Sequence, residues 1–217
     1  MKHEQLALFE PESIPPSSMP EGFRYAPDLI GADEEARLVA MFADLPFREF
    51  EFHGFLGKRR VVSFGSRYDY NRGGLQEAAP IPAFLLPLRE RAATFAGLEP
   101  DRLQAALVTE YQPGTTIGWH RDRPHYGDVI GVSLLSPCTF RMRRRNGMTW
   151  DRASMRLDPC SVYLMHGPSR DVWEHSIPAV DALRYSVTFR TMRDRNSSLG
   201  WAKRNPGIGG NACPGFR

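Results

Sequence analysis

The chain has 217 residues, 41% of them hydrophobic and 11% aromatic, and carries a formal net charge of +3. This composition fits one globular domain with a sizeable core, and the charge is too small to indicate nucleic-acid binding by itself. No stretch is apolar enough to cross a membrane, and three cysteines without a Cys-x-x-Cys pair indicate neither a disulfide framework nor a zinc knuckle. Because no apolar signal-peptide region opens the chain, we expect a cytoplasmic protein, and we expect it to be a monomer.

The two ends of the chain are predicted to be tails around one domain at residues 21–195. Residues 1–20 end in a Pro- and Ser-rich stretch that cannot build a core, and residues 196–217 are rich in Gly, Asn, Ser and Pro. The first tail contains a peptide that resembles the one by which bacterial polymerases and repair proteins dock on the sliding clamp. So short a pattern also arises by chance or by local packing. The candidate clamp contacts are Gln5, Leu6, Leu8 and Phe9.

Two helices are expected in the first half of the domain. The first opens with three acids from Asp33, which favour a helix N-terminus, and is stopped by Pro46. Its predicted apolar side comprises Leu38, Met41, Phe42 and Leu45. The second runs over residues 83–96 and ends at Gly97. Both are expected to buttress a sheet.

Aromatic and basic side chains are interleaved between Phe47 and Arg60, around Gly54 and Gly57. Aromatic faces can stack on an extruded nucleobase and basic groups can bind phosphates, which is what chemistry on a base requires. The simpler alternative is a hairpin that packs its phenylalanines on the core.

Short strands separated by Gly and Pro turns are predicted from residue 103 onward. Their close spacing fits a sandwich or a small barrel. The predicted strands are 104–111, 129–135, 139–144, 161–165, 172–177 and 184–190.

A basic hairpin is predicted within residues 141–156, where six arginines face one acid, Asp151. The turn signal Asn146-Gly147 lies in the middle of this run. Such a hairpin can bind phosphates, with Arg143 and Arg145 as the candidate contacts. Charged edge strands also occur simply as protection against pairing with other chains, and both interpretations stay open.

Three residues are candidate ligands of one metal ion. His120 and Asp122 are two positions apart, so on an extended strand their side chains point to the same face. His175 follows in an aromatic and β-branched segment that suits a strand. Two histidines and one carboxylate on one side of a metal leave open positions, as in non-haem Fe(II) oxygenases.

The segment from Arg184 to Arg190 alternates polar and apolar residues, which predicts a half-buried strand with both guanidinium groups on its polar face. Their Cα atoms would lie roughly 20 Å apart on such a strand. If both side chains lean along the strand, the gap between them shrinks to the length of a small dicarboxylic acid. Arginine suits bidentate carboxylate binding.

Taken together, these motifs resemble those of the AlkB-type Fe(II)/2-oxoglutarate-dependent dioxygenases, over roughly residues 21–193. The likeness rests on Tyr111, His120-Arg121-Asp122, the segment 166–170 leading into His175, and Arg184 through Arg190, with 61–65 and 67–69 ahead of the metal motif. One departure is Thr109, which stands where the family usually has an asparagine.

The resemblance implies a mainly β (α+β) double-stranded β-helix, a distorted jelly roll buttressed by N-terminal helices. It also implies Fe(II)-, 2-oxoglutarate- and O2-dependent demethylation of alkylated bases in DNA or RNA, as in DNA alkylation repair, with release of succinate, CO2 and formaldehyde. By the same resemblance, iron would be bound by His120, Asp122 and His175, and 2-oxoglutarate by Tyr111, Arg184, Arg190 and Thr109. The implied substrate contacts are Phe52, His53 and Phe55 in a lid, with Arg67, Tyr68, Arg143 and Arg145.

Two other functions remain open at this point. The same iron chemistry could act on a protein, a lipid or a small molecule. A non-catalytic module could also use a jelly-roll pocket for recognition alone, although it would not need three ligands and two arginines together.

Overall fold

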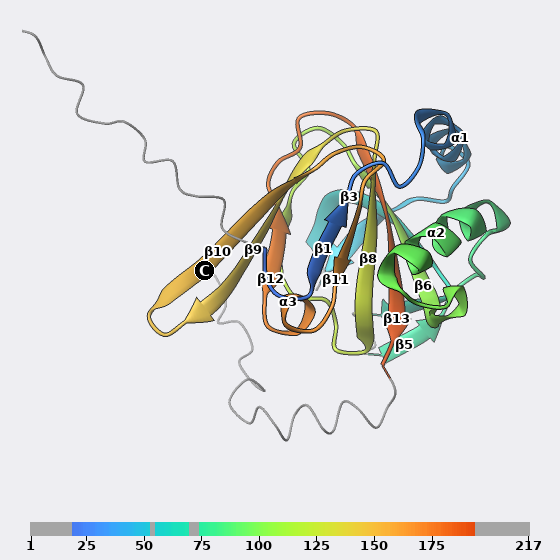
Figure 1. Ribbon diagram of the computed structural model, residues 1–217. Helices are drawn as coiled ribbons and strands as arrows, with labels where there is room; N and C mark the ends of the chain where they lie inside the picture. The colour runs from blue at the N-terminus through green and yellow to red at the C-terminus, as the bar shows by residue number, and fades with distance from the viewer. Residues whose placement is uncertain (1–18, 53–54, 70–73, 194–217) are drawn as a thin grey trace, which may run out of the picture.

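The computed structural model describes residues 19–52, 55–69 and 74–193. Two antiparallel sheets face each other and form the body of the molecule (Figure 1). The larger has the strand order β1-β11-β8-β13-β6-β3-β2, the smaller has the order β10-β9-β12-β7, and β4 pairs with β5 beside them. The strands of the larger sheet are β1 Phe23–Ala26, β2 Arg48–Phe52, β3 Phe55–Phe64, β6 Leu103–Tyr111, β8 Tyr126–Leu134, β11 Val162–Met165 and β13 Arg184–Met192. The others are β4 Ser66–Asp69, β5 Gly74–Glu77, β7 Ile117–His120, β9 Cys138–Asn146, β10 Thr149–Leu157 and β12 Glu174–Ile177.

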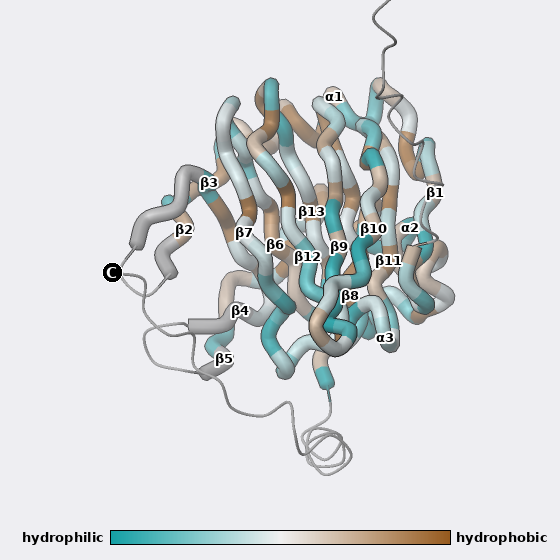
Figure 2. The backbone as a smooth tube through the Cα atoms, turned by 90° about the vertical axis from the view of Figure 1, so that its left-hand side faces the viewer, coloured by the Kyte–Doolittle hydropathy of each residue, from teal (hydrophilic) through white to brown (hydrophobic). Residues whose placement is uncertain are grey.

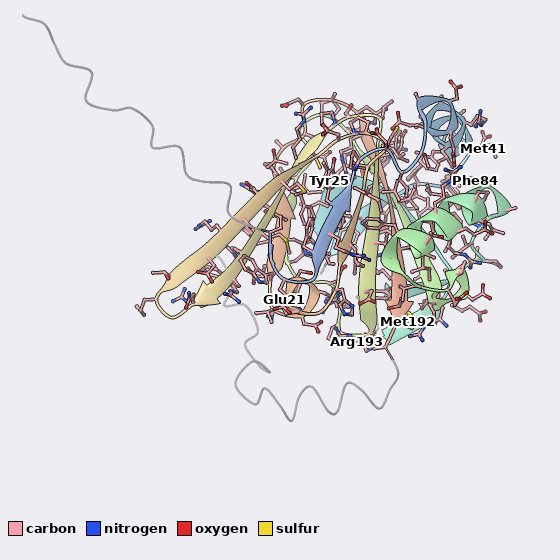
Figure 3. The ribbon with its side chains drawn as sticks, viewed as in Figure 1. Glu21, Tyr25, Met41, Phe84, Met192 and Arg193 are labelled. Atoms are coloured by element: carbon pink, nitrogen blue, oxygen red, sulfur yellow. The ribbon has the colours of Figure 1, made fainter. Side chains whose placement is uncertain are left out.

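Two helices, α1 Ala32–Phe42 and α2 Leu86–Ala96, cover the outer face of the larger sheet (Figure 1). They bury their apolar sides against it, and the Phe84 ring, labelled in Figure 3, lies 6.3 Å from that of Phe42. A second core fills the space between the two sheets, with Phe140 and Met142 of β9 against Tyr111 and Tyr163 of the larger sheet. No helix in the described part of the chain is long and apolar enough to cross a membrane.

The helix predictions are confirmed in place but not in every detail. Helix α1 ends at Phe42, before Pro46, and Met41 is 47% exposed, so its placement on the buried side was wrong. Helix α2 follows a short 3-10 turn and ends at Gly97, whose φ of 73° is in the left-handed region that glycine adopts without strain.

All six predicted strands are present, while β1, β4 and β5 had not been predicted. The segment 172–177 is strand only from Glu174, because a short helix, α3 Pro168–Asp171, precedes it. Strand β13 was expected to be half-buried, but it lies in the middle of the larger sheet and both its faces are buried. Its polar face turns toward the space between the sheets rather than toward solvent.

The basic hairpin is confirmed as β9–β10, with Asn146 opposite Thr149 and Gly147 at a φ of 58° in the turn. It extends beyond the body of the molecule in Figure 1, and its strands carry hydrophilic stretches in Figure 2, which views the molecule from the side of the smaller sheet.

A buried carboxylate, Glu110, anchors strand β6 on the helix-covered face. Arg60 of β3, its cross-strand partner, donates two hydrogen bonds of 2.8 Å to it, and Gln112 and Tyr185 add bonds of 3.0 Å each. Burial by itself raises the pKa of Glu110, but the bonds from Gln112, Arg60 and Tyr185 outweigh it and hold the pKa below its usual value. The carboxylate is therefore ionised and fully paired inside the fold.

Candidate metal centre and active site

The three predicted ligands converge at one end of the smaller sheet. His120 is the last residue of β7 and stands opposite His175 of β12 in the ladder, with ring centroids 4.2 Å apart. Asp122 lies two residues beyond the end of β7, and its Oδ1 is 4.0 Å from Nε2 of His120. One donor atom from each residue lies within 4.8 Å of the other two. The side chains meet as predicted, although Asp122 is on a loop and not on the expected strand.

The protonation states of this group suit a metal ion. Burial lowers the pKa of His175 to about 3 and also lowers that of His120, so both rings are neutral at physiological pH. Burial raises the pKa of the Asp122 carboxyl, but Arg190, His175 and Arg170 outweigh it and keep the pKa well below its usual range. Two neutral imidazoles and one carboxylate are the forms in which these side chains bind metals.

The tautomer of His120 is fixed by the backbone. Its Nδ1 lies 2.9 Å from the carbonyl oxygen of Gly118, which can only accept, so Nδ1 carries the proton and Nε2 presents its lone pair toward Asp122. A set of two histidines and one carboxylate with this orientation fits Fe(II), whose oxygenase sites use the same donors and leave coordination positions open.

A cavity of about 760 Å³ opens beside the three ligands. Its walls come from the inner faces of both sheets and include Thr109, Tyr111, Val129, Phe140, Tyr163, Thr188 and Arg190. Its lining also includes two aromatic side chains, Phe50 and Trp119, and the basic residues Arg59, Arg121 and Arg123. The Arg59 guanidinium stacks on the Phe50 ring at 3.8 Å. The cavity is large enough for an aromatic ring of nucleobase size beside a small diacid.

Arg184 and Arg190 occupy different positions around this cavity. Arg190 lines it, with Nε 3.6 Å from Oδ2 of Asp122. Arg184 is only 1% exposed and lies behind the wall, 4.7 Å from the ring of Tyr111, its cross-strand neighbour. It donates one hydrogen bond of 3.1 Å to Ser133, while its Nε and Nη1 have no partner among the described residues. A buried guanidinium with donors to spare fits the carboxylate of a diacid.

Tyr111 and Thr109 are both buried residues of β6 that line the cavity, and their contact with 2-oxoglutarate stays a prediction. The Tyr111 hydroxyl lies 3.1 Å from the Ser186 hydroxyl on β13. Ser186 and Ser133, which contacts Arg184, were not singled out from the sequence, since serine on a strand carries no specific signal.

Arg170 is a functional candidate that the sequence analysis left without a role. It is 4% exposed and donates to three backbone carbonyls, those of Arg123, Tyr126 and Gly127, at 2.7 to 2.9 Å. Arg123 lies in the loop that carries Asp122, and Tyr126 and Gly127 open β8, where that loop ends. Arg170 therefore holds the loop that carries one of the three ligands. Its place in the segment 166–170, already part of the resemblance, was the signal that could have found it.

The predicted substrate contacts are only partly described. His53 lies outside the described residues. Phe52 and Phe55 are paired at backbone level where β2 meets β3, and Arg67 and Tyr68 lie in β4. The side chains of these last four residues are not among those described. Arg143 and Arg145 are on β9, outside the cavity. The clamp peptide, the predicted tail 196–217 and all of the predicted tail 1–20 except its last two residues also lie outside the described residues. Each of these roles stays a prediction.

Comparison with known proteins assigns the family. The model of the 2OG-Fe(II) oxygenase superfamily matches residues 33–193, which contain all three ligands and both arginines. The chain belongs to this superfamily. Iron and 2-oxoglutarate are the cofactor and co-substrate that the family uses, and the ligand set described above fits the metal.

The relatives of this superfamily member are AlkB-like. The chain is 25% identical, over 85% of its length, to the "Alkylated DNA repair protein ALKBH8 homolog" of Arabidopsis thaliana, and 26% identical, over 70%, to the "RNA demethylase ALKBH9B" of the same plant. It covers 59% and 33% of the lengths of these two proteins. The chain thus spans about three fifths of the first relative and a third of the other.

Solved structures confirm the double-stranded β-helix. The chain superposes on the structure titled "The structure of OsALKBH1" with a TM-score of 0.65, at 15% identity, covering 82% of this chain and all of that one. A 2OG-Fe(II) oxygenase from Burkholderia pseudomallei gives a TM-score of 0.56 at 18% identity, covering 80% of this chain and 86% of that one. At these identities the likeness concerns the fold alone.

Proposed function

We propose that the protein demethylates alkylated nucleobases in DNA or RNA, with iron bound by His120, Asp122 and His175. The observation that carries this proposal is the cavity itself. Its lining contains the three ligands together with aromatic and basic side chains, among them Phe50 with Arg59 stacked on its ring. An extruded base needs an aromatic face and its flanking phosphates need positive charge, so this lining matches a nucleotide better than it matches a lipid or an uncharged metabolite.

The relatives support the same substrate class. Two of them are named for alkylated DNA repair and for RNA demethylation, and the similarity to each includes most of this chain. DNA repair as the biological role follows from the first name and is part of the proposal.

Each residue of the site has a distinct part in the proposed reaction. His120, Asp122 and His175 would hold Fe(II) on one side and leave its cavity-facing positions open. Arg184 would pair with the distal carboxylate of 2-oxoglutarate, and Arg190, beside Asp122, would meet its metal-proximal end. Bound iron and 2-oxoglutarate supply the activation of O2 and the oxidising equivalents that release the methyl group as formaldehyde.

The protein contributes position and protection from water. Phe140 stacks on the His175 ring at a centroid distance of 5.4 Å and restricts its movement. Tyr111 and Thr109 offer hydroxyl groups on the wall next to the buried Arg184. Val129, Phe140 and Ile177 add apolar side chains to the lining, so a base in the cavity would be shielded from water on that side.

Formaldehyde release from methylated oligonucleotides tests the proposal. The purified protein is incubated with Fe(II), 2-oxoglutarate and ascorbate, and formaldehyde and succinate are measured with methylated and with unmodified strands. Methylated strands should release formaldehyde in proportion to the additional succinate formed. His120→Ala should abolish both products.

His166→Ala provides the matched control, because His166 is an exposed histidine that pairs with Asp128 at 2.6 Å, outside the ligand group. It should retain wild-type turnover. Succinate formation without formaldehyde from any methylated strand would refute the nucleobase substrate and favour a protein, lipid or small-molecule substrate. Absence of succinate under every condition would refute catalysis.

A further inference from the structure

The outer face of the smaller sheet carries a row of arginine and tryptophan side chains that the proposed reaction does not use. Arg141, Arg143 and Arg145 alternate on β9 with the buried Phe140 and Met142, so all three arginines point away from the core. The helices cover only the larger sheet, and this face of the smaller sheet lies on the opposite side of the molecule (Figure 1).

Two indole rings contact the three guanidinium groups. Arg143 stacks on Trp119 at 4.4 Å and on Trp150 at 4.3 Å, Arg141 lies 5.2 Å from the Trp119 ring, and Arg145 lies 5.4 Å from the Trp150 ring. The Arg–Trp row consists of Arg141, Trp119, Arg143, Trp150 and Arg145. It crosses the sheet from β7 to the tip of the β9–β10 hairpin.

The arginines of the Arg–Trp row are held in a way that leaves phosphate-binding groups available. Each uses Nε for its protein hydrogen bond: Arg141 to Ser176, Arg143 to Glu174 and Arg145 to the carbonyl of Gly147. No described residue accepts a hydrogen bond from their terminal nitrogens. An oriented guanidinium with two such amino groups binds a phosphate at little cost in side-chain entropy.

Charge on this face is strongly one-sided. The exposed Arg152 lies opposite Arg143 on β10 and adds a further positive charge, whereas the carboxylate in contact with the row is Glu174. Asp151, the acid of the hairpin, pairs with Arg144 on the other face of the ribbon. The face therefore complements a polyanion.

The Arg–Trp row is continuous with the cavity through one residue. Trp119 contacts Arg141 and Arg143 on the outer face, and it also lines the cavity next to the ligand His120. A nucleic-acid strand whose methylated base lies in the cavity therefore contacts Trp119 of the row directly.

We propose that a single-stranded nucleic acid runs from the cavity along the Arg–Trp row, with its phosphates on the arginines and its unpaired bases stacked on Trp119, Trp150 and the guanidinium planes. This inference rests on the proposed nucleobase substrate, and it specifies that the nucleic acid is single-stranded. Flat aromatic and guanidinium groups bind bases through their faces, which a duplex keeps covered, so the row selects single strands.

Binding to unmodified strands tests this without any turnover. Fluorescence anisotropy measures the affinity of the full chain for a labelled 12-nucleotide strand, its duplex and a trinucleotide at several salt concentrations. Arg145→Ser combined with Arg152→Ser should weaken binding of the 12-nucleotide strand about tenfold or more and lower the slope of log affinity against log salt by about 1.4, which is about 0.7 for each lost phosphate contact. The trinucleotide should bind the variant and the wild type equally.

Trp150→Leu separates stacking from charge. It should weaken binding of the 12-nucleotide strand about 5- to 100-fold, with an unchanged salt slope. Arg144→Ser is the charge control, since it removes one arginine from β9 but on the opposite face, where Arg144 pairs with Asp151 and contacts Trp173. It should leave the salt slope as in the wild type. Melting temperatures of all variants verify that each is folded.

The outcomes separate the two proposals. Equal binding of the strand by wild type, by the arginine double variant and by Trp150→Leu overturns the role of the row, even if methylated strands are demethylated. Duplex binding as tight as single-strand binding also overturns it. Row-dependent binding without formaldehyde release would support the row while refuting the proposed demethylation.

Discussion

Arg184→Met should remove a buried charge that binds the co-substrate and does not stabilise the fold. The guanidinium is 1% exposed, and its Nε and Nη1 lack partners within the described residues. Methionine has a similar length and needs no hydrogen bonds, so it can fill the same space beside Tyr111. Replacing a poorly satisfied buried charge by an apolar side chain is neutral or stabilising by about 1–4 kcal/mol. The melting temperature of the metal-free variant should therefore stay the same or rise by several degrees.

The same change should impair co-substrate binding. A carboxylate that loses an ion pair with one or two charge-assisted hydrogen bonds loses about 3 kcal/mol, which is roughly 100-fold in affinity. Thermal melts with increasing 2-oxoglutarate, in the presence of Mn(II) as an unreactive substitute for Fe(II), measure this directly. The wild type should be stabilised by 2-oxoglutarate, and the variant should need roughly 100-fold more for the same shift.

Arg60→Met is the informative control, because Arg60 also pairs with a carboxylate on β6 but on the other face. Its loss leaves Glu110 buried with fewer partners. The protein should lose about 1–3 kcal/mol of stability, given the half-exposed position of Arg60, while 2-oxoglutarate affinity stays unchanged. If Arg184→Met instead destabilised the protein and left 2-oxoglutarate binding intact, Arg184 would be a structural charge and its assignment would be wrong.

Three further predictions concern the loop, the cavity and pH. Arg170→Gln loses the bonds to the carbonyls of Arg123 in the loop and of Tyr126 and Gly127 at the start of β8, and it should weaken Mn(II) binding about 10- to 100-fold in calorimetric titrations; unchanged affinity would contradict the anchoring role. Gly131→Ala places a Cβ 2.3 Å from the Tyr163 ring and should cost about 1–3 kcal/mol in urea unfolding, whereas Gly118→Ala meets nothing within 4 Å and should cost less. Because the folded-state pKa of His175 is about 3, below its ordinary value, the unfolded chain takes up the proton first as pH falls. The metal-free protein should lose about 2 kcal/mol of stability between pH 7 and pH 5, and a His175→Gln variant should show a shallower dependence.

The ligand set could be predicted from the sequence, but the reason for its geometry could not. A two-residue spacing suggested one strand carrying both His120 and Asp122, while β7 ends at His120. The carboxylate reaches the imidazole through a loop whose shape depends on Arg170, almost fifty residues away in the chain. Local periodicity contains no information about such a long-range hydrogen bond.

The polar face of β13 shows a second limit of sequence patterns. Alternation correctly placed Arg184 and Arg190 on one face, but a polar face can turn toward solvent or toward an internal cavity with the same residues. Only the second sheet, which covers that face, decides between the two. The lid residues Phe52, His53 and Phe55 remain predictions for the same reason, since their roles depend on tertiary placement.

The ion pair between Arg60 and Glu110 helps to fix the register of strand β6 against β3. Side chains change faces at every residue, so sliding β6 by one position against β3 would turn Glu110 inward and send Thr109 and Tyr111 to the helices. Such a shift would place the Glu110 carboxylate in the cavity without its partners and leave Arg60 opposite a threonine or a tyrosine. The ion pair therefore disfavours the shifted register. In this way an interaction on the helix-covered face of β6 keeps Thr109 and Tyr111 on the cavity face.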